Sequence, residues 1–428
     1  MLYYKPNVQY RKPYTIIKSL FIFGGIIMSL LLRNNGAILL LMFNIFLVFT
    51  GIGLVIPIMP TYMTELHISG STVGMLVAAF SLTQLLFSPL AGRLSDTMGR
   101  KKIIISGMIV FAISEWLFGA ASTPTLLFAA RMLGGIGAAL IMPAVMAYTA
   151  DVTSNEERAR GMGFINAAIT TGFIIGPGIG GFIAEFGIRV PFYAAAVAGG
   201  IAALVTLLLL PESSAKQEAP TVLGRKQESL AVQLVRSFRE PYFLSLIIVF
   251  VLSFGLANYE TVFGLFVDHK FGFTPKDIAM IITFGSIAGA VVQATIFGWI
   301  LNRFGEKRVI TLSLLTAGIC ILLTLFVHKY WLIFLVTFLV FLSIDILRPA
   351  IGTQMSKLAK DQQGYVAGLN SAYTSLGNIA GPLVAGYLFD LDINFPYISA
   401  SIVLILCFFL AMRAGRAWAA TEAVTNER

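Results

Sequence analysis

Long apolar runs separated by short polar turns make up most of this chain of 428 residues. The runs are about as long as the roughly twenty residues that cross a bilayer as a helix, and none shows the alternation of a membrane β-barrel strand. The pattern predicts an all-α integral membrane protein with twelve transmembrane helices in two six-helix halves. The predicted spans are 36–59, 72–92, 103–122, 125–149, 161–184, 191–211, 241–266, 277–300, 309–327, 330–351, 364–389 and 395–413.

One long polar segment in the middle of the chain separates the first six spans from the last six. The predicted regions are an N-terminal cytoplasmic or interfacial segment (1–35), an N-terminal six-helix bundle (36–211), a cytoplasmic central loop (212–240), a C-terminal six-helix bundle (241–413) and a cytoplasmic tail (414–428). Within the first region, the apolar run 19–32 is too short to span. It predicts either an interfacial helix or a true translation start at Met28.

Composition supports the same class of protein. The chain is 57% hydrophobic and 12% charged, whereas a soluble domain carries about 25% charged residues. The net charge of +9 does not indicate nucleic-acid binding, because the basic residues form short clusters between apolar runs without interleaved aromatics. Cys320 and Cys407 lie inside apolar runs, as small buried hydrophobes do. With three scattered histidines, they predict neither a disulfide framework nor a metal site.

The positions of Lys and Arg predict the orientation, since cytoplasmic loops carry an excess of both. With the N-terminus placed inside, four bases fall outside and two lie within spans, which leaves 24 of the 30 on the cytoplasmic side. We therefore expect both termini and the central loop to be cytoplasmic. The bases predicted outside are Arg189, Lys270, Lys276 and Lys329, and those within spans are Arg131 and Arg348.

Two unrelated motifs recur in the second half at almost the same offset. "GRLSDTMGRKK" at 92–102 matches "GWILNRFGEKR" at 298–308, which lies 206 residues later. "IIGPGIGG" at 174–181 matches "IAGPLVAG" at 379–386, which lies 205 residues later. The chain is therefore predicted to be a duplicated six-span unit. Such repeats are typical of transporters, whose ligand site lies between the repeats near mid-membrane.

These motifs resemble those of the major facilitator superfamily over about residues 36–413. The turn at 92–102 matches the pattern G-x-L-x-D-x-x-G-R-K-x, and "RMLGGIGAA" at 131–139 resembles the span-4 motif, with Gly134 where Gln is frequent. "GFIIGPGIGG" at 172–181 resembles the span-5 motif of drug–proton antiporters. Two further stretches resemble bacterial quinolone and multidrug exporters: "NIFLVFTGIGLVIPIMP" at 44–60 and "FLSIDILRPAI" at 341–351.

The resemblance implies a proton-coupled antiporter of the bacterial plasma membrane. It would export small hydrophobic or cationic molecules by alternating access, as a monomer, without catalytic activity and without a cofactor besides the proton gradient. The pattern G-x-x-x-x-G-K-[ST] does not occur, so ATP is not the energy source within this chain. Two alternatives are a carrier for one endogenous metabolite, which would need a more polar cavity, and a non-transporting sensor or scaffold, which would need no buried acids.

The turn at 92–102 is interpreted as a conformational latch. Gly92 and Gly99 permit close packing and a tight turn. Asp96 can accept hydrogen bonds from the N-terminus of a nearby helix, and it can pair with Arg100 or with a base on another helix. Such a latch would hold the halves together on the cytoplasmic side and would break when the cavity opens inward. The simpler alternative is a positive loop that only sets topology.

The span-5 motif combines a proline with small residues. Pro177 removes a helix hydrogen bond and bends the helix, while the glycines let a neighbouring helix approach closely. A packing seam is one function of this motif, and a bend that shapes the cavity and restricts leak is the second. The predicted antiporter-motif residues are Gly172, Gly176, Pro177, Gly180 and Gly181.

Ionisable residues within predicted spans are costly, so they face protein or water and are functional candidates. Asp345 and Arg348, three residues apart, can pair on one helix face, and Glu115 and Arg131 lie at similar depths on neighbouring spans. Glu260 has no obvious partner in the sequence. Burial favours the uncharged form of such an acid, so it could exchange a proton near neutral pH.

Glu260 and Asp345 are accordingly predicted to be the carboxylates that bind protons and substrate. Arg131 matches the span-4 arginine that the resemblance ties to proton coupling, and Arg348 either tunes Asp345 or snorkels from a helix end. Glu115 is expected to be structural. Large apolar and aromatic walls suit broad specificity. The predicted lining residues are Phe49, Gln84, Phe164, Asn166, Phe173 and Asn370, with Asn258, Gln293 and Tyr373 as further candidates.

Overall fold

The computed structural model describes residues 36–154, 157–213, 230–359 and 363–426. Within these ranges all regular secondary structure is helical, as the apolar pattern predicts. Eleven of the described helices are long and apolar enough to cross a membrane. The expectations for residues 1–35, including a start at Met28, lie outside the described residues.

The N-terminal half follows the predicted order of spans. Residues 36–54 are helical and lead through a short 3₁₀ turn into a brief helix, after which five long helices follow. The named elements of this half are η1 (Ile56–Ile58), α2 (Met59–Leu66), α3 (Gly70–Met98), α4 (Arg100–Ala120), α5 (Pro124–Val152), α6 (Arg158–Ile183), η2 (Ala184–Phe186) and α7 (Val190–Leu209).

The C-terminal half departs from the predicted spans at one place. The predicted span 277–300 is interrupted at Ile296, where α10 ends and α11 begins. The elements of this half are α8 (Leu230–Ser237), α9 (Phe243–Phe271), α10 (Pro275–Thr295), α11 (Phe297–Phe304), α12 (Glu306–Leu323), η3 (Thr324–Phe326), α13 (Tyr330–Ala359), α14 (Gln363–Leu391) and α15 (Phe395–Asn426).

The predicted span 364–389 coincides with α14, a helix of 29 residues. It is not among the eleven apolar helices, because its sequence is interrupted by glycines, Asn370, Asn378 and Pro382. Such a helix lies more favourably against protein than against lipid, and α14 packs against α3 and α9.

Local sequence signals explain where several helices begin and end. The Ser69 hydroxyl accepts a hydrogen bond from the Thr72 N–H at the start of α3, and Thr274 forms a reciprocal capping box with Asp277 at the start of α10. Gly99 alone separates α3 from α4, with φ +100°, and Gly305 with φ +77° plays the same part in the second half. The predicted polar turn at 92–102 is therefore almost entirely helical.

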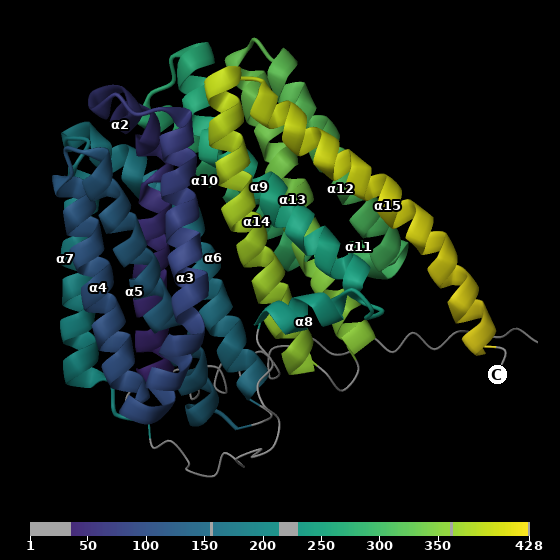
Figure 1. The fold of residues 1–428 in the computed structure, drawn as a ribbon, viewed down its shortest axis with the longest axis horizontal. Coiled ribbons are helices and arrows are strands. Elements are labelled where there is room, and N and C mark those ends of the chain that lie inside the picture. The colour runs from purple at the N-terminus through teal and green to yellow at the C-terminus, as the bar shows by residue number, and fades with distance from the viewer. Residues whose placement is uncertain (1–35, 155–156, 214–229, 360–362, 427–428) are drawn as a thin grey trace, which may run out of the picture.

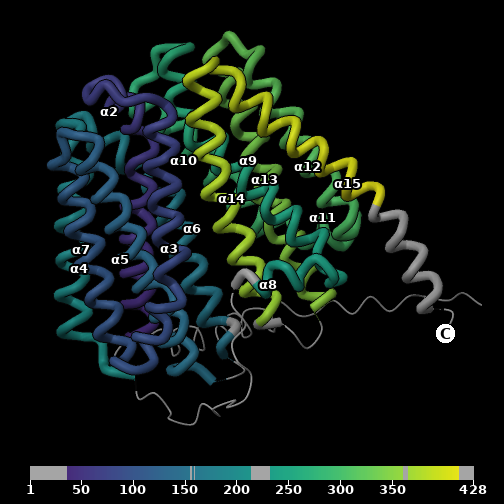
Figure 2. Tube along the Cα trace, in the orientation of Figure 1, coloured from purple at the N-terminus to yellow at the C-terminus, as the bar shows by residue number. Residues whose placement is uncertain are grey.

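The two most extensive contacts between the halves are α3 with α14 and α6 with α10, and η1, α2 and η2 also contact α9 or α10. A Cβ atom on Gly74 would lie 2.1 Å from the Pro382 carbonyl oxygen, and one on Gly181 would lie 2.3 Å from the Ala279 Cβ atom. The halves meet near α2 and diverge toward α8 (Figure 1), as the Cα tube also shows (Figure 2). We call these the α2 end and the α8 end. One apolar core joins the C-terminal half to N-terminal residues of the α2 end, such as Val55 and Phe192, whereas a second core lies within the N-terminal half.

The glycines of α6 pack as the small-residue motif predicts. Those at 172, 176 and 180 lie against the backbone of residues 46–54, whereas those at 178 and 181 face α10. The second half repeats the arrangement, since Gly377 and Gly381 lie against α9 and Gly386 lies against α3. This repeated packing confirms the duplication inferred from the motifs. Pro177 lies inside α6 without ending it, and its Cδ atom would be 2.9 Å from a Cβ atom on Gly53.

Candidate functional site

Three charged side chains form a group inside the C-terminal half: Glu260 on α9, with Asp345 and Arg348 on α13. Arg348 and Asp345 both act electrostatically on Glu260, which has no obvious partner in the sequence. Arg348 also acts on Asp345, but among the described residues no hydrogen bond or ion pair within 4.0 Å joins the three. We call these residues the α9–α13 charge group.

The Asp345 carboxylate lies directly against the backbone of α10. A Cβ atom built on Gly289 would be only 1.9 Å from the Asp345 Oδ2 atom. Asp345 and Glu260 are both half-buried, and Arg348 is exposed. The two acids therefore lie partly inside the helical bundle.

The N-terminal half holds a second buried pair of opposite charge. Glu115 on α4 and Arg131 on α5 are 3% and 7% exposed. They act on each other electrostatically without a direct ion pair, and neither Glu115 Oε2 nor Arg131 Nε has a hydrogen-bond partner. The Arg131 guanidinium carbon lies 4.5 Å from the centre of the Phe118 ring, a cation–π contact. The predicted proximity of the two charges is confirmed, but their interaction is not a salt bridge.

The predicted lining residues divide by exposure. Phe49 is buried and Phe173 is 42% exposed, and their rings form an edge-to-face pair with centroids 4.8 Å apart. Gln84, Phe164 and Asn370 are half-buried, and Asn166 is exposed. Of this set, only Phe49 and Phe173 are brought together by a described ring contact or hydrogen bond.

Two of the further lining candidates are enclosed by protein. Asn258 is fully buried in this structure, with its side-chain amide 3.5 Å from the Ser399 hydroxyl. Tyr373 is 6% exposed, and its hydroxyl lies 2.8 Å from the Ser237 hydroxyl of α8. Gln293 on α10 is exposed.

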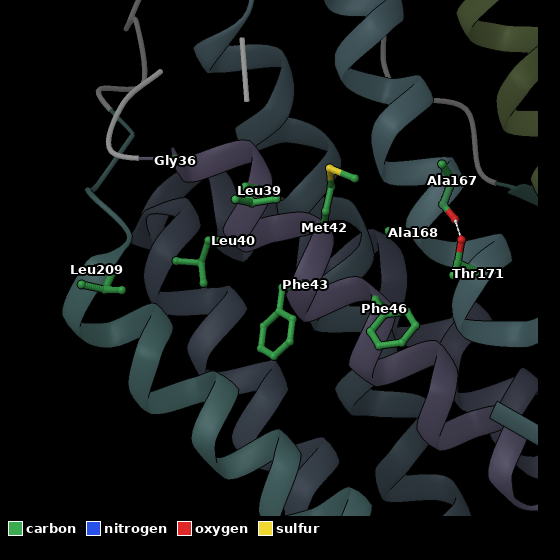
Figure 3. Close-up of a pocket in the computed structure, with 10 residues that line it drawn as sticks. All are labelled: Gly36, Leu39, Leu40, Met42, Phe43, Phe46, Ala167, Ala168, Thr171 and Leu209. Carbon is green, nitrogen blue, oxygen red and sulfur yellow. Dashed lines mark hydrogen bonds between the residues drawn. The ribbon is translucent and has the colours of Figure 1, made fainter. Parts of the chain in front are cut away.

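The structure also contains an apolar cavity that the sequence reasoning missed. Its volume is about 900 Å³, and it is bounded by the first helix, the middle of α6 and the end of α7 (Figure 3). The only hydroxyl in its lining, that of Thr171, donates to the Ala167 carbonyl at 2.7 Å. No sequence signal distinguishes these apolar side chains from ordinary lipid-facing ones. The lining residues are Gly36, Leu39, Leu40, Met42, Phe43, Phe46, Ala167, Ala168, Thr171 and Leu209.

At the α8 end, the predicted latch residues bind within their own half. Asp96 forms an ion pair with Arg100, and Arg100 Nε lies 3.2 Å from Asp151 Oδ2 on α5. Gly99 is needed for both its backbone angle and its packing, because a Cβ atom there would lie 2.7 Å from the Glu212 carboxylate. A Cβ atom on Gly92 would meet nothing within 4 Å, so close packing at Gly92 is not present in this structure.

The second half repeats this ion pair with the charges exchanged. Glu306 and Lys357 form an ion pair between α12 and α13. Glu306 follows Arg100 by 206 residues, and Lys357 follows Asp151 by the same number. The repeat therefore preserves the position of the interaction rather than the identity of either residue.

At the α2 end, charged contacts cross between the halves. The Asp390 carboxylate of α14 accepts hydrogen bonds from the backbone N–H groups of Gly70 at 2.7 Å and Ser71 at 2.9 Å, and from the Ser71 hydroxyl. These N–H groups begin α3, where the helix dipole favours an anion. Lys276 of α10 also forms an ion pair of 2.9 Å with Glu185 of η2.

In the part of the chain that the structure describes, twelve long helices in two repeated halves, with charged side chains inside, define a membrane transporter built by duplication. The chain matches the model of the Major Facilitator Superfamily over residues 41–292 and 245–423, and it belongs to that family. It is 50% identical to multidrug resistance protein 2 of Bacillus subtilis over 375 residues, which cover 87% of this chain and 94% of the relative. It is 41% identical to the quinolone resistance protein NorA of Staphylococcus aureus over 363 residues, covering 85% and 92%.

Solved structures show the same fold. A mutant form of the nucleoside transporter NupG aligns with a TM-score of 0.75 at 17% identity, covering 88% of this chain and 99% of that one. A bacterial homologue of the lysosomal transporter Spinster aligns with a TM-score of 0.73 at 16% identity, covering 88% and 96%. These similarities support the major facilitator fold predicted from the sequence.

Proposed function

We propose that this protein is a proton-coupled antiporter that exports hydrophobic, often cationic drugs, including quinolones and dyes, across the bacterial plasma membrane. The observation that carries the proposal is the α9–α13 charge group, in which two acids and one base act on one another without a direct ion pair. The relatives named as multidrug and quinolone resistance proteins support the substrate class.

The proposed orientation places both termini and the α8 end in the cytoplasm, because Lys and Arg collect in the segments predicted there. With this orientation, the halves meet on the outer side and diverge toward the cytoplasm (Figure 1). Such a conformation would accept a drug from the cell interior. Export then requires the α2 end to open and the α8 end to close.

The chemistry of exchange follows from the two carboxyl groups. Ionised Glu260 and Asp345 attract a cation inside a bundle of low polarity, where electrostatic interactions are stronger than in water. Each acid can lose its charge by taking up a proton, and Arg348 supplies a neighbouring positive charge. Protonation would cancel the attraction and release the drug, and the proton gradient would supply the energy without a cofactor.

The proposed binding wall combines aromatic and amide side chains. The edge-to-face pair of Phe49 and Phe173 offers a broad apolar surface, while Gln84, Asn166 and Asn370 provide few directional contacts. A wall of this kind accepts many ligand shapes. We include Phe164 because it is half-buried on the same helix, α6, as Phe173.

Arg131 is proposed to take part in proton coupling from the N-terminal half. Its charge is buried and satisfied mainly by the Phe118 ring and by the field of Glu115. An unpaired buried charge of this kind responds strongly to a change in its neighbour's charge. The proposed function of the α6 glycines and Pro177 is to keep α6 closely packed and so to restrict leak.

The test is efflux of ethidium and norfloxacin from cells, and transport of both by purified protein in liposomes with an imposed proton gradient. A protonophore should abolish transport in cells even when ATP remains. Efflux that continues after the gradient collapses would contradict antiport. Transport of one metabolite, with no movement of either drug, would favour a single-substrate carrier instead.

The site is tested by Glu260→Gln, which resembles the protonated acid in shape. We expect this variant to lose nearly all export of monovalent cations, because the site would stay in its proton-loaded form. Asp345→Asn should lose transport and also melt at a lower temperature, since Arg348 loses a counter-charge. Asp268→Asn, an acid on the same helix outside the charge group, is the control. Wild-type cation export by Glu260→Gln, with unchanged pH dependence, would refute this site.

A further inference from the structure

The contact between α10 and α13 contains two glycines one helical turn apart, Gly285 and Gly289. Each lies opposite a residue of α13, and those two residues are also one turn apart. A Cβ atom on Gly285 would lie 3.1 Å from the Phe341 ring, whereas one on Gly289 would lie 1.9 Å from the Asp345 Oδ2 atom and 2.9 Å from its Cγ atom. The carboxylate thus occupies the space that a side chain at position 289 would need.

The contacts at Gly285 and Gly289 differ in how they would respond to a larger residue. At position 285, a methyl group would require the Phe341 ring to shift by only a few tenths of an ångström. At position 289, a methyl group would require the carboxylate to move by roughly 1.5 Å to reach van der Waals distance. Displacements of about 1 Å in a reacting group cost large factors in rate. The contact is therefore selective for glycine only where it meets the acid.

The same helix, α10, carries a contact to the other half. A Cβ atom on Gly181 of α6 would lie 2.3 Å from the Ala279 Cβ atom, and one on Gly178 would lie 3.0 Å from the Thr283 hydroxyl. One face of α10 thus bears on α6, while another bears on Asp345. The helix that contacts the Asp345 carboxylate is thus also one that forms the interface between the halves.

We propose that Gly289 is a positioning residue that sets the depth of the Asp345 carboxylate against α10, and so links its ligand state to the packing of α10. This inference rests on the proposed function of Asp345 as a proton- and substrate-binding acid. The other charged groups that act with Asp345 are Arg348 on the same helix and Glu260 on α9. A side chain at 289 would displace the carboxylate relative to both.

The experiment compares Gly289→Ala with two matched variants. The first is Gly285→Ala, which lies on the same helix, α10, and faces the same neighbouring helix, α13. The second is Gly352→Ala on α13, where an added Cβ atom would meet nothing within 4 Å. Alanine is the better helix former at all three positions. We expect Gly289→Ala to lower the rate of cation export about tenfold or more and to weaken cation binding, while Gly285→Ala and Gly352→Ala stay within about twofold of wild type.

A double-mutant cycle separates positioning of Asp345 from general packing. Asp345→Ala removes the clashing atoms, so Gly289→Ala should lower the melting temperature of wild type but not that of Asp345→Ala. In the purified Gly289→Ala variant, binding of cationic ethidium should weaken more than binding of a neutral drug, because the substitution acts through the carboxylate. Additive effects of the two substitutions, or equal losses for neutral and cationic drugs, would overturn the inference.

The outcomes for Gly289 and for the proposed function are distinguishable. If Asp345→Ala exports cations at the wild-type rate, the proposed function of Asp345 fails whatever Gly289→Ala does. If Asp345→Ala is inactive and Gly289→Ala behaves as wild type, the positioning inference fails and the proposed function of Asp345 stands.

Discussion

The two ends of the α3–α14 interface use the same residue type in different ways. Asp390 lies in the last turn of α14, and its carboxylate crosses to the other half, where it caps the N-terminus of α3. Asp96 lies in the last turn of α3, and its carboxylate stays in its own half with Arg100. An acid in the last helical turn is disfavoured by the helix dipole unless it finds a partner. In this structure, the acid at the end where the halves meet has its partner in the other half, and the acid at the end where they diverge has its partner in its own half.

This difference suggests a reciprocal arrangement. When the α8 end closes, Asp96 would come near the start of α14 and could accept N–H hydrogen bonds there, as Asp390 does at the start of α3. The two carboxylates would then act in alternation, each holding one end while the other end is open. The following predictions test that comparison, from the largest expected effect to the smallest.

Asp390→Asn should have the largest effect. The amide lacks the negative charge that favours the start of α3, and loss of a cap costs about 0.5–2 kcal/mol. A loss of about 1.4 kcal/mol within this range would change the equilibrium constant between the two conformations by about tenfold. We expect slower drug export and greater labelling of single cysteines placed at the α2 end.

Asp392→Asn is the matched control for that experiment. The Asp392 carboxylate accepts hydrogen bonds only from Asn394 among the described residues, within the same turn. It should leave export and labelling near wild type. Equal behaviour of the two variants would show that the cap on α3 does not hold the α2 end.

Asp96→Asn should have the opposite conformational effect and a smaller effect on stability. Asp96 forms an ion pair with Arg100, but the Asp96 side chain is 64% exposed. Exposed ion pairs contribute up to about 1 kcal/mol to stability. We expect lower turnover, retained drug binding and less labelling at the α2 end. Asn302→Ala, at the equivalent position of the second half, is the control. Unchanged turnover in Asp96→Asn would reduce the turn to a topology signal.

Asp151→Asn should have a moderate effect on the packing of the α8 end. Its carboxylate binds Arg100 and also accepts a hydrogen bond of 3.1 Å from the Ser213 hydroxyl. Lys357→Gln breaks the equivalent pair in the second half, where the lysine is 67% exposed. We expect thermal melting to fall more for Asp151→Asn than for Lys357→Gln, because the first pair is less exposed. Equal shifts would show that burial does not distinguish the two pairs.

Lys276→Gln should have the smallest effect. The Lys276–Glu185 pair crosses the halves at the α2 end, but its side chains are 40% and 53% exposed. Such pairs are screened by salt and contribute about 0–1 kcal/mol. Export should fall by at most a few-fold at low salt and be unchanged at high salt. A large, salt-independent loss would mean that this pair, rather than the Asp390 cap, holds the α2 end.

The sequence by itself determined the class of fold, the repeat and the motif residues. The length of an apolar run determines whether the run can cross the bilayer as a helix, so spans can be predicted without knowledge of the neighbouring helices. Motif glycines at spacings of four report on helix–helix packing, and those of α6 pack as predicted. The offset between the halves identified equivalent positions even where their charges are exchanged.

Only the tertiary structure decided which groups meet. Glu260 lies 85 residues before Asp345 in the chain, and no periodicity indicates that α9 and α13 bring the two together with Arg348. The capping of α3 by Asp390 and the contact of Gly289 with Asp345 were likewise invisible in the sequence. Each depends on the approach of helices from distant parts of the chain, whereas hydropathy and local motifs describe one helix at a time.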